Sequence, residues 1–143
     1  GKIVINQFAS DSYLTVFDAI ESRGCSMLEA ESDVFGFDHA VACEALLEKW
    51  QFSEELRVPV AYQYRPSEAP THRKLASMLH LAKWIVSGLG VNYGRDAFAF
   101  HVDDRVLEIL ALDAKTAELQ LLNVQSRLQE VKGLLKAVPA TAE

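Results

Sequence analysis

Three small groups of side chains in this sequence have types that could support chemistry, and each contains a histidine. In the first, His101, Asp103 and Asp104 could supply nitrogen and oxygen ligands to a metal ion. Aspartates at the start of a helix more often act as caps, so we favour capping for this group. In the second, His80 and Trp84 lie one helical turn apart, a spacing that indicates packing more than a binding pocket.

The third group begins at His39 and follows one face of a predicted helix. This face is formed by His39, Cys43, Leu46, Leu47 and Trp50. A histidine at the start of the buried face of a helix could have a function. It could also be a core or boundary residue that is hydrogen-bonded to a neighbouring loop. We favour the second interpretation because buried polar groups usually have a structural partner.

The sequence contains no strong catalytic motif. A P-loop, a G-x-G-x-x-G motif, an H-E-x-x-H motif and a paired-cysteine motif are all absent. No serine or cysteine can be matched with a histidine base from sequence, although such pairing is decided in space rather than along the chain. Motifs alone therefore give no reason to predict an enzyme.

The chain before His39 predicts two helices. Apolar residues recur with a helical period over 13–23, and Gly24 is suited to end that helix because it tolerates a left-handed conformation. Ser26 and Glu29 form a capping box for a short helix that should end near Asp33.

The helix that carries His39 should follow a turn. The turn is predicted at Phe35-Gly36-Phe37, and Asp38 is a suitable N-cap. The helix should then run to about Trp50. This turn and helix contribute Phe35, Gly36, Asp38, His39 and Trp50 to the candidate site.

The middle of the chain predicts two further helices. Ser53 opens the first, in which Pro59 could introduce a kink or end a first segment. Thr71 is the expected cap of a long helix that ends near Leu89. That helix carries a wide apolar stripe, which we expect to be its packed face: Leu75, Met78, Leu79, Ala82, Ile85, Val86 and Leu89.

The last helix has the most regular pattern. Residues 91–102 should form a loop, a short helix should begin at Asp103-Asp104, and Asp113 should cap a helix over about 114–138. Its apolar residues alternate spacings of three and four, as in a heptad seam: Ala114, Ala117, Leu121, Val124, Leu128, Val131, Leu135 and Val138. The helix could pack along its own domain, which we favour, or it could form an interface with another chain.

Length and composition favour one domain over residues 1–143. The net charge of −6 and the scattered basic residues argue against nucleic acid as a main partner. No run of about 18 apolar residues exists, so no membrane span is expected. Cys25 and Cys43 could form one disulfide, but two free cysteines and a cytoplasmic location are the preferred prediction.

The start of the chain is open to two interpretations. Residues 1–8 are apolar and β-branched and could form a short strand or the end of a helix. The abrupt start at Gly1 suggests a fragment or a processed form of a longer protein. A fragment would have an incomplete core, so we would then expect its apolar faces to be buried in an oligomer.

Several of these segments together resemble the HDOD family, the HD-related output domain of bacterial signalling proteins. The resemblance covers most of residues 1–90 and suggests the C-terminal part of such a domain. It rests on Gly1-Lys2-Ile3-Val4-Ile5, Ser26-Met27-Leu28-Glu29-Ala30-Glu31, Phe35-Gly36-Phe37-Asp38-His39-Ala40, Trp50–Leu56, Val60–Pro66 and Leu75–Gly90.

Three positions depart from what the resemblance implies for a metal-dependent phosphohydrolase. This chain has Gln63 and Tyr64 where two histidines often stand, and Lys83 where an aspartate often stands. Gln and Tyr are poorer ligands than imidazole and carboxylate, and a lysine adds a positive charge where a negative one would be needed.

The resemblance therefore implies an all-α, multi-helical, HD-domain-like bundle of about six to seven helices that ends in a long amphipathic helix. It also implies a non-catalytic regulatory domain with no bound metal or cofactor. Such a domain would bind a protein partner or self-associate through the C-terminal helix, with Leu121, Leu128 and Leu135 as interaction candidates. The alternative is a divergent metal-dependent phosphohydrolase acting on a nucleotide or phosphoester.

Overall fold

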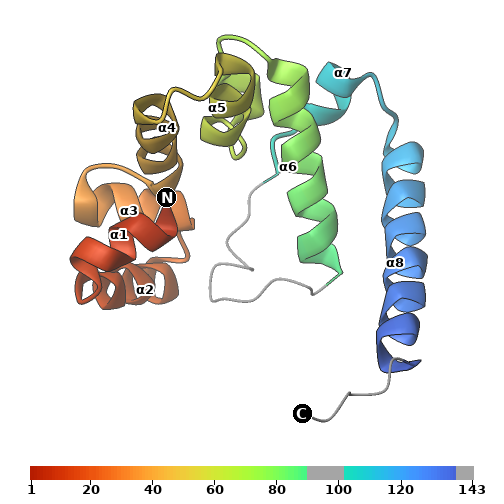
Figure 1. The fold of residues 1–143 in the computed structure, drawn as a ribbon, viewed down its shortest axis with the longest axis horizontal. Helices are drawn as coiled ribbons and strands as arrows, with labels where there is room; N and C mark the ends of the chain where they lie inside the picture. The colour runs from red at the N-terminus through yellow and green to blue at the C-terminus, as the bar shows by residue number, and fades with distance from the viewer. Residues whose placement is uncertain (90–101, 138–143) are drawn as a thin grey trace.

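The chain folds as a succession of helices (Figure 1). The structure is a computed structural model, which describes residues 1–89 and 102–137. The helices are α1 (Lys2–Ala9), α2 (Ser12–Arg23), α3 (Met27–Phe35), α4 (His39–Lys49), α5 (Glu54–Ala61), the 3-10 turn η1 (Pro66–Glu68), α6 (Arg73–Gly88), α7 (Val106–Leu110) and α8 (Ala114–Ala137). The described residues contain no strand, which confirms the predicted all-α class. The helix count exceeds six to seven because the ambiguous N-terminal segment forms α1.

The first four helices surround one apolar core. Its fully packed residues come from α1, α2 and α3: Ile5, Tyr13, Val16, Met27 and Ala30. The predicted ends of these helices are confirmed where local chemistry decides them. Gly24 ends α2 at a φ of 63°. Ser26 and Glu29 exchange both hydrogen bonds of a capping box at the start of α3.

The turn before α4 has the predicted residues but begins later. Helix α3 continues to Phe35 rather than ending near Asp33, and Gly36 ends it at a φ of 78°. Asp38 caps α4 by accepting hydrogen bonds from the backbone N–H groups of Ala40 and Val41, at 2.8 and 2.9 Å. A left-handed glycine followed by a side-chain cap reverses the chain within three residues.

Helix α1 packs closely against the start of α4. A Cβ atom on Gly1 would lie 1.8 Å from the carbonyl oxygen of His39. Only a glycine fits this approach without movement of one backbone. Figure 1 shows the N-terminus beside the entry to α4 accordingly.

A second, smaller core joins α5, η1 and α6. It contains Val58, Ala69 and Ala76. Pro59 neither kinks the chain out of α5 nor ends it, and its side chain is buried. The expected cap of α6 is wrong: the helix begins at Arg73 after His72, while the Thr71 hydroxyl donates a hydrogen bond to Glu54.

The predicted packed face of α6 is also wrong in part. Leu75 and Met78 are 40% and 55% exposed, and Ala82 is exposed as well. The buried residues of α6 are instead Ala76, Ser77, His80 and Ile85. Small side chains at Ala76 and Ser77 let η1 and α5 approach the helix closely, and this approach decides which face is covered.

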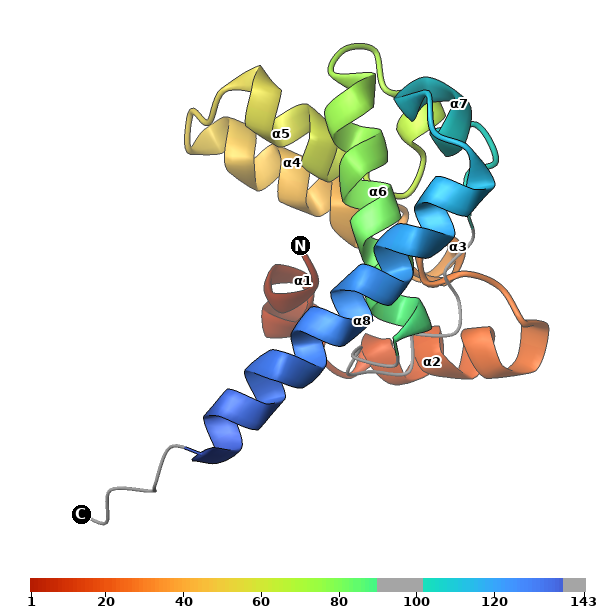
Figure 2. The same cartoon turned by 90° about the vertical axis from the view of Figure 1, so that its right-hand side faces the viewer.

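Helices α7 and α8 lie on the far side of α6 from α4. Asp113 caps α8 as predicted, by accepting a hydrogen bond from the N–H of Thr116 at 2.6 Å. Figures 1 and 2 both show α8 extending past the end of α6. The expected loop over 91–102 lies outside the described residues except for Val102, and His101 and Val138 lie outside them too. No described helix is long and apolar enough to cross a membrane.

Candidate functional site

A chain of polar contacts links five separate segments. It begins at Tyr13 on α2 and Glu31 on α3, passes through His39 at the start of α4 and Tyr64 in the turn after α5, and reaches Lys83 on α6. We call these five residues the polar chain. It includes two of the three positions at which the sequence departs from the family's metal ligands.

Glu31 is the anchor of the polar chain. Its side chain is completely buried. One carboxylate oxygen accepts from the Tyr13 hydroxyl at 3.0 Å, and the other accepts from both the backbone N–H and the Nδ1–H of His39, at 2.8 and 2.5 Å. Burial raises the pKa of this carboxyl, but its hydrogen bonds to His39, the charge of His39 and the hydrogen bond from Tyr13 outweigh burial and leave the pKa below its usual value. Glu31 is therefore held as a carboxylate.

His39 has both ring nitrogens engaged. Because the Glu31 carboxylate can only accept, Nδ1 carries a proton, and Nε2 lies 2.8 Å from the Tyr64 hydroxyl. The two rings meet edge to face with centroids 5.1 Å apart. This arrangement is that of a buried histidine hydrogen-bonded to a neighbouring loop. It leaves neither ring nitrogen open to a metal or a substrate.

Lys83 places a positive charge against Tyr64 of the polar chain and against the neighbouring Gln63. Its Nζ donates to the amide oxygen of Gln63 at 3.1 Å. The same Nζ lies 3.7 Å from the centroid of the Tyr64 ring, in the geometry of a cation–π contact. The structure thus brings Lys83 against Gln63 and Tyr64, although Lys83 lies about twenty residues after this pair in sequence.

His80 ties α6 to the segments on either side of it. Its Nε2 faces the backbone N–H of Asp103 at 3.0 Å, and its Nδ1 faces the carbonyl oxygen of Gln63 at 2.9 Å. A backbone N–H can only donate and a carbonyl can only accept, so Nδ1 carries the proton and the ring is neutral. Burial lowers the pKa of His80, with a further contribution from Lys83, and outweighs the hydrogen bond to Gln63 and the charge of Asp103.

Asp103 stabilises a turn and is not the predicted helix cap, because α7 begins later, at Val106 after Arg105. Its two carboxylate oxygens accept from the backbone N–H groups of Ser67 and Arg105, each at 3.0 Å. Asp104 is exposed at the start of the same turn. Among the residues that the structure describes, no three His, Cys, Asp or Glu side chains are grouped so that they could hold a metal.

The residues at the family's ligand positions do not fit a divalent metal. An amide, a phenol and an ammonium group meet there, and the ammonium group already donates to the Gln63 amide oxygen and lies over the Tyr64 ring. A divalent cation at this place would be repelled by Lys83 and would find no carboxylate from residues 63, 64 or 83.

The remaining predicted site residues lie on the surface or near it. Trp50 was expected on the buried face of α4 but is 61% exposed, because α4 ends at Lys49 and Gln51 turns the chain at a φ of 59°. Phe35 packs edge to face on Tyr13, with ring centroids 5.5 Å apart. Leu121 and Leu128 are half-buried on α8. Leu135 lies in the last turns of α8, and its side chain is outside the described residues.

Sequence reasoning missed Glu31 as the anchor of the polar chain. A signal was present, because Glu31 follows Met27 by four residues and Ala30 by one on the apolar face of α3. A glutamate at such a position must find hydrogen-bond donors in the fold. Only the tertiary structure shows that Tyr13 and His39 provide them.

Comparisons with known proteins agree with the resemblance over part of the chain. Residues 1–66 match the model of the HDOD domain family. The match lies in the N-terminal region of the chain and ends before the Leu75–Gly90 stretch, whereas the resemblance in the sequence covers most of residues 1–90 and suggests the C-terminal part of the domain. No curated protein and no solved structure matches the chain significantly.

The matched segment includes α1 to α5 and contains four of the five residues of the polar chain. It also contains the Gly1 approach to His39 and the Phe35-Gly36-Phe37-Asp38-His39 turn, which the structure shows to be packed against each other. Residues 1–66 of this chain are therefore similar to the HDOD domain family, in line with the resemblance of their motifs.

Proposed function

We propose that this chain is a non-catalytic regulatory or interaction domain of a signalling protein. The family match supports an HD-related output domain as the broader class. The position of Lys83 is the observation that supports a non-catalytic role. Its ammonium group contacts Gln63 and Tyr64, at positions where the family resemblance implies metal ligands. A fixed internal cation makes this site structural rather than metal-binding.

The alternative, a divergent metal-dependent phosphohydrolase, would need ligands elsewhere. His39 and His80 are the described histidines nearest to the site, and each already uses both ring nitrogens. Either ring would have to give up a buried hydrogen bond before it could bind a metal, and an unmade buried bond costs about 1–3 kcal/mol. No observation on the described residues favours this alternative.

The metal content of the purified protein tests this proposal. After incubation with Mn²⁺ and removal of free ions, we expect no stoichiometric metal in the native chain and no Mn²⁺-dependent phosphohydrolase activity. The Lys83→Asp variant, which replaces the cation by a carboxylate, should bind Mn²⁺ more tightly than the native chain. About one equivalent of metal in the native chain, lost in His39→Ala, would instead support the phosphohydrolase.

The partner of such a domain is proposed to bind α8 or to be a second copy of this chain. The N-terminal half of α8 is held by its own domain, where Ala117 is buried and Leu121 lies close to Gly88 on α6. Leu119 and Leu122 are exposed on the same half of the helix, and Val131 is exposed further along it. This exposed apolar surface supports an interaction role for α8.

A further inference from the structure

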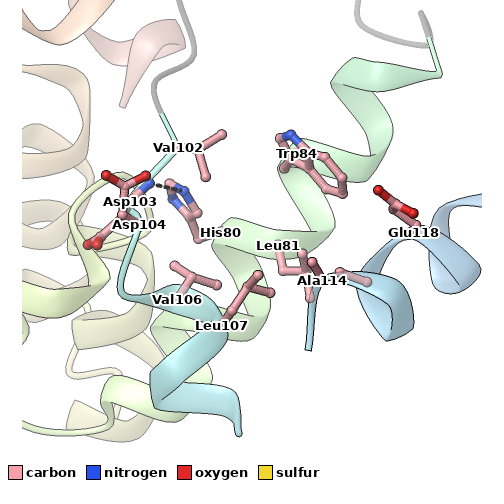
Figure 3. Close-up of a pocket in the computed structure, with 11 residues that line it drawn as sticks. His80, Leu81, Trp84, Val102, Asp103, Asp104, Val106, Leu107, Ala114 and Glu118 are labelled. Atoms are coloured by element: carbon pink, nitrogen blue, oxygen red, sulfur yellow. Dashed lines mark hydrogen bonds between the residues drawn. The ribbon is translucent and has the colours of Figure 1, made fainter. Parts of the chain in front are cut away.

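A cavity of about 250 Å³ lies between α6, α7 and the start of α8 (Figure 3). It is distinct from the polar chain, because none of the five polar-chain residues lines it. Its volume is slightly below the range of about 300–1,000 Å³ typical of ligand pockets, so an occupant would have to be small.

The walls of this cavity are mostly apolar. The indole of Trp84 forms one side, and the aliphatic side chains of Leu81, Val102, Val106 and Leu107 form much of the rest. Figure 3 shows these side chains converging on a common space, with Trp84 on one flank and Val102 and His80 on the other. Such walls suit an aromatic or branched aliphatic body.

The polar groups of two lining residues are already used. Both ring nitrogens of His80 are hydrogen-bonded, to Gln63 and Asp103, so the imidazole presents only carbon to a ligand. Both carboxylate oxygens of Asp103 accept backbone N–H groups. His80 therefore presents no free polar atom to an occupant, whereas Asp103 keeps its negative charge and can accept further hydrogen bonds.

Two carboxylates on the rim remain available to an occupant. Glu118 on α8 stands beside Trp84, and Asp104 lies at the other side of the cavity (Figure 3). Among the side chains that the structure describes, neither has an ion-pair partner, and no lysine or arginine lines the cavity. An indole face beside a carboxylate is a favourable environment for an organic ammonium group.

We propose that this cavity binds a small organic monocation with an apolar body, in the class of arylalkyl ammonium ions. The body would pack against Trp84, Leu81 and Leu107, while the ammonium group would lie at the rim near Glu118 and the indole. Charge complementarity selects a cation as the occupant, because Asp103, Asp104 and Glu118 line the cavity and no lysine or arginine among the described residues does. This site is independent of the proposed loss of catalysis and does not require a second chain.

Tryptophan fluorescence provides a direct test with 2-phenylethylammonium as the probe. The chain has two tryptophans, so a Trp50→Phe background, which changes an exposed residue, leaves Trp84 as the only indole reporter. We expect a saturable change in Trp84 emission at pH 7. The neutral analogue 2-phenylethanol should bind several-fold more weakly, and the anion 3-phenylpropionate should bind more weakly still.

Two variants locate the site. Glu118→Gln should lower the affinity for 2-phenylethylammonium by about two- to five-fold, as expected for a partly exposed ion pair, and leave the affinity for 2-phenylethanol unchanged. Glu130→Gln makes the same charge change elsewhere on α8 and should have no effect. Ala114→Leu should fill part of the cavity and weaken all three ligands.

The proposal would be overturned by any of three results. The first is no saturable Trp84 response to 2-phenylethylammonium. The second is binding of 3-phenylpropionate at equal or higher affinity, which would show that the rim does not select a cation. The third is an equal effect of Glu118→Gln and Glu130→Gln, which would assign the change to net charge rather than to this cavity.

Discussion

At the scale of single residues, the carboxylate of Glu31 determines how His39 is oriented. Three donors converge on it from α2 and α4, and all three lie out of contact with water. A buried carboxylate in this position is stable only while its donors remain. The buried donors of Tyr13 and His39 in turn depend on this carboxylate as their acceptor. The orientation of His39 towards Tyr64 therefore depends on a residue one helix away.

Replacing Glu31 with alanine should destabilise the fold strongly. The change removes the common acceptor of three buried hydrogen bonds, one from the Tyr13 hydroxyl and two from His39. Removal of one partner of a buried ion pair typically costs about 3–5 kcal/mol. Urea unfolding followed by circular dichroism would measure this loss. Glu130→Ala, an exposed change on α8, should alter the free energy of unfolding by less than about 0.5 kcal/mol. A similar small effect of both changes would contradict the assignment of Glu31 as the anchor.

His80 should make the free energy of unfolding depend on pH. Its folded pKa is lowered below the ordinary value of 6.5, mainly by burial, so the unfolded chain binds more protons near and below that pH. The contribution of His80 is therefore complete above about pH 6.5 and is lost as pH falls towards the folded pKa. Protonation would also place an N–H on Nε2 opposite the N–H of Asp103.

The matched test compares the pH dependence of unfolding in His80→Gln and His72→Asn. The loss of stability between pH 7.5 and 5.5 should be smaller in His80→Gln than in the native chain. His72 is exposed, at a φ of 53° that asparagine tolerates, so His72→Asn should retain the native slope. Equal slopes in all three proteins would show that His80 is not the responsible group.

At the scale of elements, left-handed residues decide where the N-terminal helices end. Gly36 ends α3 at a φ of 78°, and Gly133 lies inside α8 with open space around its Cβ position. The same substitution should therefore have opposite effects at the two positions. This contrast separates backbone conformation from the effect of an added methyl group.

Gly36→Ala should destabilise the fold by about 1–2 kcal/mol, because a Cβ is disfavoured in the left-handed region. Gly133→Ala should stabilise it by about 0.5–1 kcal/mol, because alanine loses less freedom on entering a helix. Midpoints of urea unfolding measure both changes. A stabilising Gly36→Ala would mean that the turn between α3 and α4 does not require the left-handed conformation.

The packed face of α6 shows how contact with other elements overrides a sequence pattern. The apolar stripe from Leu75 to Leu89 predicts one buried face, yet Leu75 and Met78 are exposed and His80 is buried. Helix α6 is covered by η1 and α5 on one side and by α7 on another, so its small residues and its histidine receive the neighbours. The spacing of apolar residues along α6 does not show how closely other helices approach each of its faces.

At the scale of the whole molecule, much apolar surface remains uncovered. Ile3 and Phe8 on α1 are 85% and 86% exposed, and Leu14 on α2 is also exposed. Exposed apolar side chains continue at Leu119, Leu122 and Val131 on α8. Single exposed residues are ordinary, but groups at both ends of the molecule favour association with a partner or a second copy.

Light scattering of Leu128→Glu tests association through α8. If the seam of this helix forms an interface, the glutamate should lower the average mass in solution because it would bury an unpaired charge between helices. Gln129→Glu adds the same charge at the neighbouring, exposed position and should leave the mass unchanged. An oligomer of the same mass in both variants would exclude the α8 seam as its interface, and association would then have to use another surface.

The sequence alone determined the helical class and most helix ends, because those depend on residues within one turn of each other. Gly24, the Ser26–Glu29 box and the Asp38 and Asp113 caps are local in this sense. The family resemblance also followed from contiguous motifs, and the match over residues 1–66 bears it out. These features need no knowledge of which helices pack together.

Only the tertiary structure decided which polar groups meet. The partners of Glu31, His39 and Lys83 lie 8 to 25 residues away in sequence, and no periodicity links them. The same holds for the buried state of His80, which depends on backbone groups of Gln63 and Asp103. A buried polar group must be paired, but the identity of its partner is set by the packing of whole helices, and this packing is not encoded in any short stretch of the chain.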